Sequence, residues 1–299
     1  MKIKFLGVGS AFTTPDYYQS NLLITARSGK QLLLDCGSDA RFALAEYLMD
    51  ERKVFDAVDA VYISHLHADH IGGMEWLAFS TYFSPQPSKL VLFMEGKLMQ
   101  KMWDHCLKGG LECIEGKMMQ LTDYFDCRPQ AEDGTFNWEG IQCTLVKMPH
   151  IITDSRNFAP NNAPHFKKPS FFKKLGFSSL LKRKLFAATS PLNHYSYGLL
   201  LTETDGKGTS VFITTDTQFR PNIIADMAEK ADIIFHDCET TPFNTPVHAH
   251  YDELCTLEAA LKQKMWLYHY QPHPSYQTEA DGFKGFVVKG QEFDLADSK

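Results

Sequence analysis

Three histidines and one aspartate lie within six consecutive positions, directly after the apolar run 60–63. They are His65, His67, Asp69 and His70, and imidazole with carboxylate oxygen suits zinc, with manganese or iron as competitors. The apolar run predicts a buried strand, and side chains alternate along a strand, so His65 and His67 are expected to point the same way and to share one metal ion. Asp69 and His70 are expected on the turn that opens the next helix, where they could hold a second ion. The alternative is a histidine-rich polar turn, but solvated loops seldom follow a buried strand with four potential ligands.

Further residues of these types follow other predicted strands. Because strand ends converge at one edge of an α/β sheet, such residues are expected to meet there. Any one of these residues alone could be a helix cap or a core residue. Several of them, each following a strand at a corresponding position, predict a shared site. The residues are His150, Asp216 and His269, which follow the predicted strands 141–146, 210–214 and 265–268.

Short apolar runs and amphipathic stretches alternate along the chain, which predicts an α/β fold with two similar halves. The other predicted strands are 3–6, 21–25, 31–35, 60–64, 90–93, 196–202 and 233–235, and the predicted helices are 39–49, 97–107, 223–230 and 252–262.

The composition is that of an ordinary globular protein of 299 residues, with 44% hydrophobic and 22% charged residues. No apolar run approaches the roughly 20 residues needed to span a bilayer, and the N-terminus runs into a strand pattern instead of a signal peptide. The seven cysteines form an odd set without a C-x-x-C pair, which favours reduced thiols. The sequence therefore predicts a soluble, cytoplasmic protein with no membrane span.

A basic and aromatic stretch at about 151–195 has little periodicity and is too long for an ordinary loop, so it is interpreted as an insertion. Lysines such as Lys173 and Lys174 alternate with aromatics such as Phe171 and Phe172, although the net charge of the chain is −6. The stretch is either a solvated loop or a surface that meets phosphates, bases, another subunit or a membrane surface.

The run H-x-H-x-D-H over 65–70, followed in order by His150, Asp216 and His269, resembles the metallo-β-lactamase superfamily over most of the chain. Within it the chain is similar to the ribonuclease Z-like phosphodiesterase branch, through the stretches 5–12, 34–37, 236–240 and 247–250. The resemblance implies an αββα sandwich, in which two packed mixed sheets are flanked by helices. It is interpreted as one domain over residues 1–299, with the insertion inside it.

The resemblance also implies a division of the ligands between two zinc ions. His65, His67 and His150 would bind one ion, Asp69, His70 and His269 the other, and Asp216 would bridge them. Two such cations can activate a shared hydroxide and stabilise an in-line phosphoryl transition state. Asp69 is also a candidate proton acceptor for that hydroxide. Asp35 either orients a ligand imidazole or is a plain turn carboxylate.

His248 is the preferred candidate for protonating the leaving oxygen or holding the phosphate, because an imidazole titrates near neutral pH and donates well to an oxyanion. His250, two residues further on, is its rival.

These features predict a dinuclear metal-dependent phosphodiesterase acting on a small diester such as a cyclic nucleotide. Ribonuclease Z-like processing of tRNA 3′ ends is the first alternative, but the overall acidity and the lack of a Gly- and Pro-rich arm count against RNA. A lactonase or thiolesterase and a non-catalytic binding module are the others. The resemblance further implies a homodimer.

Overall fold

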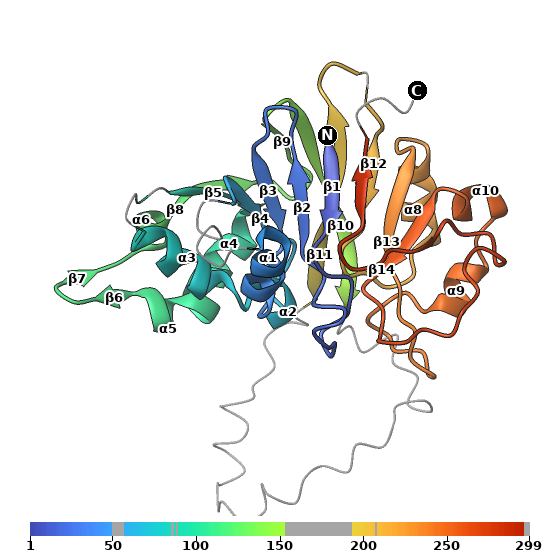
Figure 1. The fold of residues 1–299 in the computed structure, drawn as a ribbon, viewed down its shortest axis with the longest axis horizontal. Coiled ribbons are helices and arrows are strands. Elements are labelled where there is room, and N and C mark those ends of the chain that lie inside the picture. Colours follow the sequence, from blue (N-terminus) through green and yellow to red (C-terminus); the bar gives the residue numbers. More distant parts are fainter. Residues whose placement is uncertain (50–56, 85–86, 88, 153–192, 207, 296–299) are drawn as a thin grey trace, which may run out of the picture.

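Two seven-stranded mixed sheets form the centre of the computed structural model, which describes residues 1–49, 57–84, 87, 89–152, 193–206 and 208–295 (Figure 1). The first sheet has the order β16 (Glu292–Asp294), β1 (Lys2–Phe5), β2 (Leu22–Thr25), β3 (Gln31–Leu34), β4 (Ala60–Tyr62), β5 (Leu90–Glu95) and β8 (Phe125–Gln130). The second sheet has the order β15 (Gly285–Phe286), β14 (Met265–Tyr268), β13 (Ile233–Asp237), β12 (Val211–Ile213), β11 (His194–Glu203), β10 (Ile141–Ile151) and β9 (Thr135–Trp138).

The two sheets share one pairing pattern, which agrees with the two similar halves predicted from the sequence. In the first sheet the pairs from β16 to β3 are antiparallel and those from β3 to β8 are parallel. In the second sheet the pairs from β9 to β12 are antiparallel and those from β12 to β15 are parallel. Parallel strands of both sheets lead into six of the seven predicted metal-binding residues, whereas His150 lies near the end of the antiparallel strand β10.

Helices cover the outer face of each sheet. The first sheet is flanked by α1 (Ala40–Leu48), α3 (Met74–Tyr82) and α4 (Gly96–Met102), and the second by α8 (Pro221–Ala228) and α9 (Tyr251–Cys255) (Figure 1). The remaining described elements are α2 (Ala68–Ile71), the π-helical turn η2 (Trp103–Leu107), α5 (Lys108–Leu111), the hairpin β6 (Cys113–Ile114) and β7 (Lys117–Met118), α6 (Leu121–Tyr124) and α10 (Ala259–Lys262).

Because side chains alternate between the two faces of each strand, the buried residues form three hydrophobic layers. Leu22 and Ile24 of β2 face the other sheet, whereas Leu23 between them packs with the helices of its own side. Across the central layer the rings of Phe5 and Phe235 lie 4.9 Å apart. Burial on both faces of each sheet explains the short, nearly continuous apolar strands. The predicted αββα sandwich is confirmed.

Two predicted helices differ from those in the structure. The predicted helix 252–262 is two helices, α9 and α10, because the chain turns at Thr256. The Thr256 hydroxyl donates to the Glu253 carbonyl (2.6 Å), which competes with the helical hydrogen bonds. The predicted helix 97–107 changes from α4 into the π-helical turn at Trp103. Most of the predicted insertion at 151–195 lies outside the described residues.

None of the described helices is both long and apolar enough to cross a lipid bilayer.

Gly37, which follows β3, lies against the backbone of the helix that carries Asp69. A Cβ on Gly37 would come within 2.2 Å of the Asp69 carbonyl oxygen, which is a backbone atom and cannot move aside as the end of a flexible side chain can. We expect Gly37→Ala to lower the free energy of unfolding by about 1–3 kcal/mol through overpacking, measured by urea denaturation. Gly109→Ala is the control, because a Cβ there meets no atom within 4 Å. Equal unfolding midpoints for Gly37→Ala and the unaltered protein would contradict this account.

Candidate metal centre

The seven predicted ligands come together at one edge of the two sheets. His65 and His67 lie on the turn after β4, and His150 lies near the end of β10. The others are Asp69 and His70 on α2, Asp216 after β12, and His269 after β14. Their ligand atoms fall into two four-membered groups that share Asp216, and within each group the atoms lie within 4.8 Å of one another.

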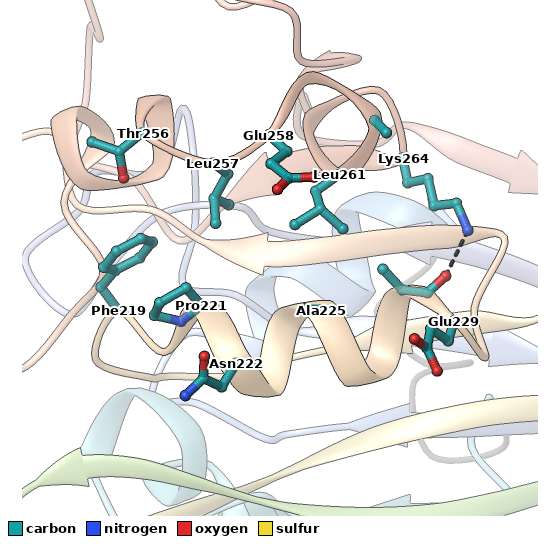
Figure 2. Close-up of a pocket in the computed structure, with 12 residues that line it drawn as sticks. Phe219, Pro221, Asn222, Ala225, Glu229, Thr256, Leu257, Glu258, Leu261 and Lys264 are labelled. Carbon is teal, nitrogen blue, oxygen red and sulfur yellow. Dashed lines mark hydrogen bonds between the residues drawn. The ribbon is translucent and has the colours of Figure 1, made fainter.

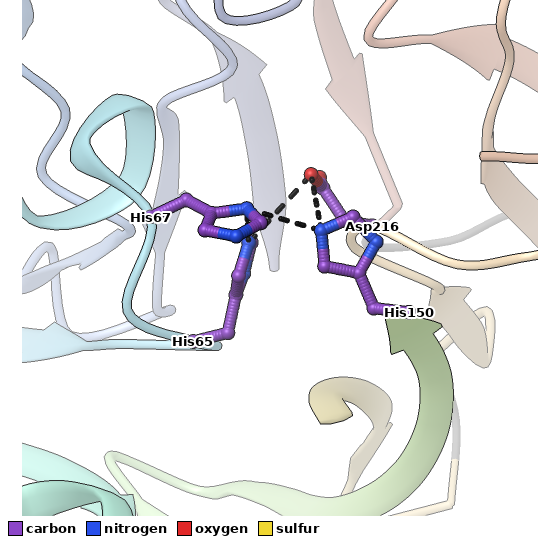
Figure 3. A group of neighbouring side chains, drawn as sticks. All are labelled: His65, His67, His150 and Asp216. Atoms are coloured by element: carbon purple, nitrogen blue, oxygen red, sulfur yellow. Dashed lines mark hydrogen bonds and ion pairs between the residues drawn. The ribbon is translucent and has the colours of Figure 1, made fainter. Parts of the chain in front are cut away.

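The first group surrounds one oxygen of the Asp216 carboxylate (Figure 3). The distance from Asp216 Oδ2 is 3.6 Å to His65 Nε2 and 3.7 Å to His150 Nε2. His67 completes the group through Nδ1, which lies 3.2 Å from His65 Nε2 and 3.1 Å from His150 Nε2. Three imidazole nitrogens and one carboxylate oxygen therefore lie close enough together to surround one metal ion.

The second group surrounds the other oxygen of the same carboxylate. Asp216 Oδ1 lies 3.2 Å from His70 Nε2 and 3.4 Å from His269 Nε2. Asp69 Oδ2 lies 3.3 Å and 3.4 Å from the same two nitrogens. The two oxygens of Asp216 thus face two different ligand sets, which is the arrangement of a bridging carboxylate.

The charges at this edge favour cations. Four carboxylates are almost fully buried, and within the described part of the chain their ion pairs are all with histidines. Burying unpaired charge is costly, so divalent cations fit a site that collects this much negative charge. His70 Nε2 supports a cation at this site, because it is buried without a hydrogen-bond partner among the described residues. The carboxylates are Asp35, Asp69, Asp216 and Asp237.

The protonation states suit metal binding on the first side of the site. Burial lowers the pKa of His150 to about 4 and also lowers the pKa values of His65 and His67, so their nitrogens keep free lone pairs at neutral pH. Burial alone would raise the pKa of Asp216, but His269 and His70 outweigh it and hold that pKa well below its usual value. Metal ions bind neutral imidazole and ionised carboxylate, so no proton blocks these ligands.

Asp35 contacts a predicted ligand in addition to the turn residue Ser64. Its Oδ2 lies 2.7 Å from His70 Nδ1, and it also accepts hydrogen bonds from the backbone and hydroxyl of Ser64 (2.8 Å each). This fixes the ring so that His70 Nε2 faces Asp216. Asp35 has a left-handed φ of 63°, and His269 has one of 62°. Backbone strain of this kind is concentrated at functional sites.

Replacing Asp35 by Asn is expected to lower metal affinity or turnover by about 10- to 100-fold, because His70 loses the acceptor that sets its orientation. Competition with a metal-indicator chelator and steady-state kinetics at saturating metal would measure the two effects. Unchanged metal affinity and unchanged turnover would assign Asp35 to the turn alone.

The two rival histidines have different surroundings. His248 Nδ1 lies 2.8 Å from Asp237 Oδ2 and 4.0 Å from Asp216 Oδ2, and its side chain is 18% exposed. Burial disfavours its charged form, but Asp237 outweighs this and raises the pKa of His248. His250 instead begins α9: its Nδ1 accepts from the Asp252 backbone (3.2 Å), and its Nε2 bonds to the Thr241 carbonyl (2.9 Å). Only His248 belongs to the edge where the ligands gather.

Asp237 has no individual role among the predictions made from the sequence, yet it contacts two of the candidate site residues. It lies at the end of β13, 2.8 Å from His248 Nδ1 and, through Oδ1, 3.2 Å from His269 Nδ1. One buried carboxylate therefore orients both a predicted ligand and the predicted acid. Its position at a strand end was the available signal, as for Asp216.

Two of the cavities in the described part of the chain lie near these elements. The larger, of about 560 Å³, lies between α8 and the α9–α10 turn and contains none of the seven predicted ligands (Figure 2). Lys264 closes one end of it by donating to the Ala228 carbonyl (2.6 Å). The smaller, of about 220 Å³, includes His65 and Leu66 in its wall and therefore adjoins the metal centre.

Two packed mixed sheets with a histidine and aspartate cluster at one edge define a protein of the metallo-β-lactamase fold. The metallo-β-lactamase fold protein YhfI from Bacillus subtilis is similar with a TM-score of 0.63 and 16% identity, covering 98% of each chain. Zinc-bound PqqB from Methylobacterium extorquens has a TM-score of 0.63 and 13% identity, covering 99% of this chain and 100% of the other.

The chain belongs to the family of the anti-Pycsar protein Apyc1, whose model matches residues 1–293. Apyc1 from Paenibacillus harenae is 31% identical over 272 residues, which are 90% of each protein. Apyc1 from Bacillus phage BSP38 is 28% identical over 296 residues, which are 98% of each. The family consists of phosphodiesterases, so the predicted superfamily and enzyme class are confirmed.

Proposed function

We propose that this protein uses two metal ions to open a cyclic nucleotide, most readily a cyclic pyrimidine nucleotide, as the degrading activity of the anti-Pycsar family suggests. The observation that carries the proposal is the Asp216 carboxylate, whose two oxygens face two separate ligand sets. His65, His67 and His150 would hold one ion, and Asp69, His70 and His269 the other. Divalent ions so placed supply an activated water and stabilise charge on the phosphoryl oxygens.

The side chains around the ions would divide the proton transfers. Asp69 is proposed to accept the proton of the attacking water, because its carboxylate lies within the second ligand set. His248 is proposed to protonate the departing oxygen. Asp237 holds His248 by Nδ1, which leaves Nε2 as the donor toward a substrate.

Purified protein loaded with zinc or manganese would be assayed on cyclic CMP, cyclic UMP, bis(4-nitrophenyl) phosphate, precursor tRNA, an acyl-homoserine lactone and a glutathione thioester. We expect hydrolysis of the cyclic nucleotides and of bis(4-nitrophenyl) phosphate, with loss of activity on chelation and recovery on adding metal back. Cleavage of precursor tRNA alone would support the ribonuclease Z-like alternative. Hydrolysis of only the lactone or the thioester would overturn the phosphodiesterase proposal, and a metal content near zero would favour a binding module.

Four further properties are proposed: the identity of the metals, the number of domains, the location and the oligomeric state. We propose that both metals are zinc, because three of the four donors on the first side are imidazoles, and that residues 1–299 form one domain. We propose that the protein is cytoplasmic, because its seven cysteines form an odd set without a C-x-x-C pair, and that it is a homodimer, as the superfamily resemblance implies. Metal analysis of the purified protein and size-exclusion chromatography with light scattering test the first and last of these.

A further inference from the structure

The small cavity beside the metal centre has walls from both halves of the protein. His65, itself a predicted ligand, and Leu66 form one wall, α4 forms a second, and the facing ends of β10 and β11 form a third. Its volume of about 220 Å³ is below the roughly 300–1,000 Å³ of pockets that enclose whole drug-sized ligands. The cavity therefore suits one small group next to the metals.

Some of the charged side chains in the cavity wall have partners of opposite charge or hydrogen-bond partners among the described residues, and others do not. Glu95 accepts a hydrogen bond from the Leu98 backbone (2.9 Å) as the cap of α4, and Glu132 is ion-paired with Lys147. The Lys147 ammonium also lies 4.0 Å from the centre of the Tyr195 ring. Both anionic side chains thus have partners.

Lys97 and Lys101 complete the wall and differ from the other charged groups. No residue in the described ranges forms an ion pair or hydrogen bond with either of them. They stand four positions apart on α4, so both ammonium groups lie on one helix face, where like charges repel. An anion between them would remove that repulsion.

We propose that Lys97 and Lys101 make this cavity an anion subsite, which receives a phosphate oxygen of the substrate or product beside the metals. The identity of the substrate rests on the proposed function, whereas the subsite is proposed to bind phosphate itself. The buried carboxylates of the metal centre largely offset the charge of two bound divalent ions. Lys97 and Lys101 then supply positive charge in a cavity that shares His65 with the metal centre, and such a patch raises the local concentration of an anionic substrate.

The test is the double variant Lys97→Met/Lys101→Met, in which methionine keeps most of the apolar stem. With metal-loaded enzyme and bis(4-nitrophenyl) phosphate, we expect KM and the inhibition constant of inorganic phosphate to rise about tenfold at low ionic strength, with kcat and metal content within about twofold. The difference from the unaltered enzyme should shrink as salt is added, because salt screens exposed charges.

Lys108→Met/Lys117→Met is the matched control, because it changes the net charge equally at two exposed lysines that pair with Glu112 and Asp123. An equal rise of KM in the control, or unchanged KM and phosphate inhibition in the α4 variant, would overturn the subsite. If the unaltered enzyme hydrolyses no phosphodiester, the proposed function fails by itself. Calorimetric binding of inorganic phosphate to the metal-loaded proteins then decides the subsite by the same comparison.

Discussion

Replacing Asp216 by Asn is expected to lower phosphodiester turnover by about a thousandfold or more and to reduce the metal content of the purified protein on both sides of the site. The carboxylate presents one oxygen to His65 and His150 and the other to His70 and His269, at 3.2–3.7 Å. The amide keeps the shape but has one weak acceptor and one donor, so it cannot bridge two cations. Steady-state kinetics and elemental analysis for metals measure the two effects.

A control for this result is Asp226→Asn, because Asp226 is exposed on α8 and takes no part in the site. Its turnover and metal content should equal those of the unaltered protein. A separate outcome would identify a mononuclear centre: if Asp216→Asn kept one metal and most of its activity, the bridging role would be wrong. Thermal unfolding of the metal-free proteins would show whether the variant is folded.

The positions of the candidate ligands along the chain could be predicted from local pattern together with the resemblance carried by the H-x-H-x-D-H run. A buried strand has a period of two, and α/β sheets collect polar residues where strands end, so His150, Asp216 and His269 could be singled out without a structure. The resemblance implied that Asp216 bridges the two ligand sets, but which of its oxygens faces which set could not be predicted. It depends on the residue before it, Thr215, which has a left-handed φ of 53°, and on how two sheets distant in sequence stack.

The roles of Asp237 and the two rival histidines depend on contacts that no local pattern encodes. Asp237 is level with Tyr268 in the parallel β13–β14 pair, which puts its carboxylate beside His269, and register between distant strands is set by tertiary packing. His248 and His250 are on a loop, where the period-two argument has no force. Glu253, three residues after His250, is the sequence feature that indicates a helix cap at His250, because the two residues form a capping box at α9.

Replacing His248 by Ala is expected to slow hydrolysis of a cyclic nucleotide by about 10²–10⁴-fold and that of bis(4-nitrophenyl) phosphate by less than about tenfold. A ribose alkoxide is a poor leaving group that needs a proton, whereas 4-nitrophenolate leaves without one. His248 is placed to give that proton because Asp237 holds its Nδ1 at 2.8 Å while 18% of the side chain remains accessible. Kinetics on both substrates, with metal content measured in parallel, provide the comparison.

His250→Asn is the matched control, since asparagine is among the best helix N-caps and can replace the imidazole at the start of α9. It should leave both reactions near the rates of the unaltered enzyme. Equal losses on the two substrates in metal-loaded His248→Ala would mean that His248 positions the phosphate and is not the acid. A leaving-group dependence in His250→Asn would move the role to His250, although its ring already accepts from the Asp252 backbone N–H and bonds to the Thr241 carbonyl. Loss of activity alone could not show whether His248 donates a proton or binds the phosphate. The comparison of two leaving groups separates these two roles.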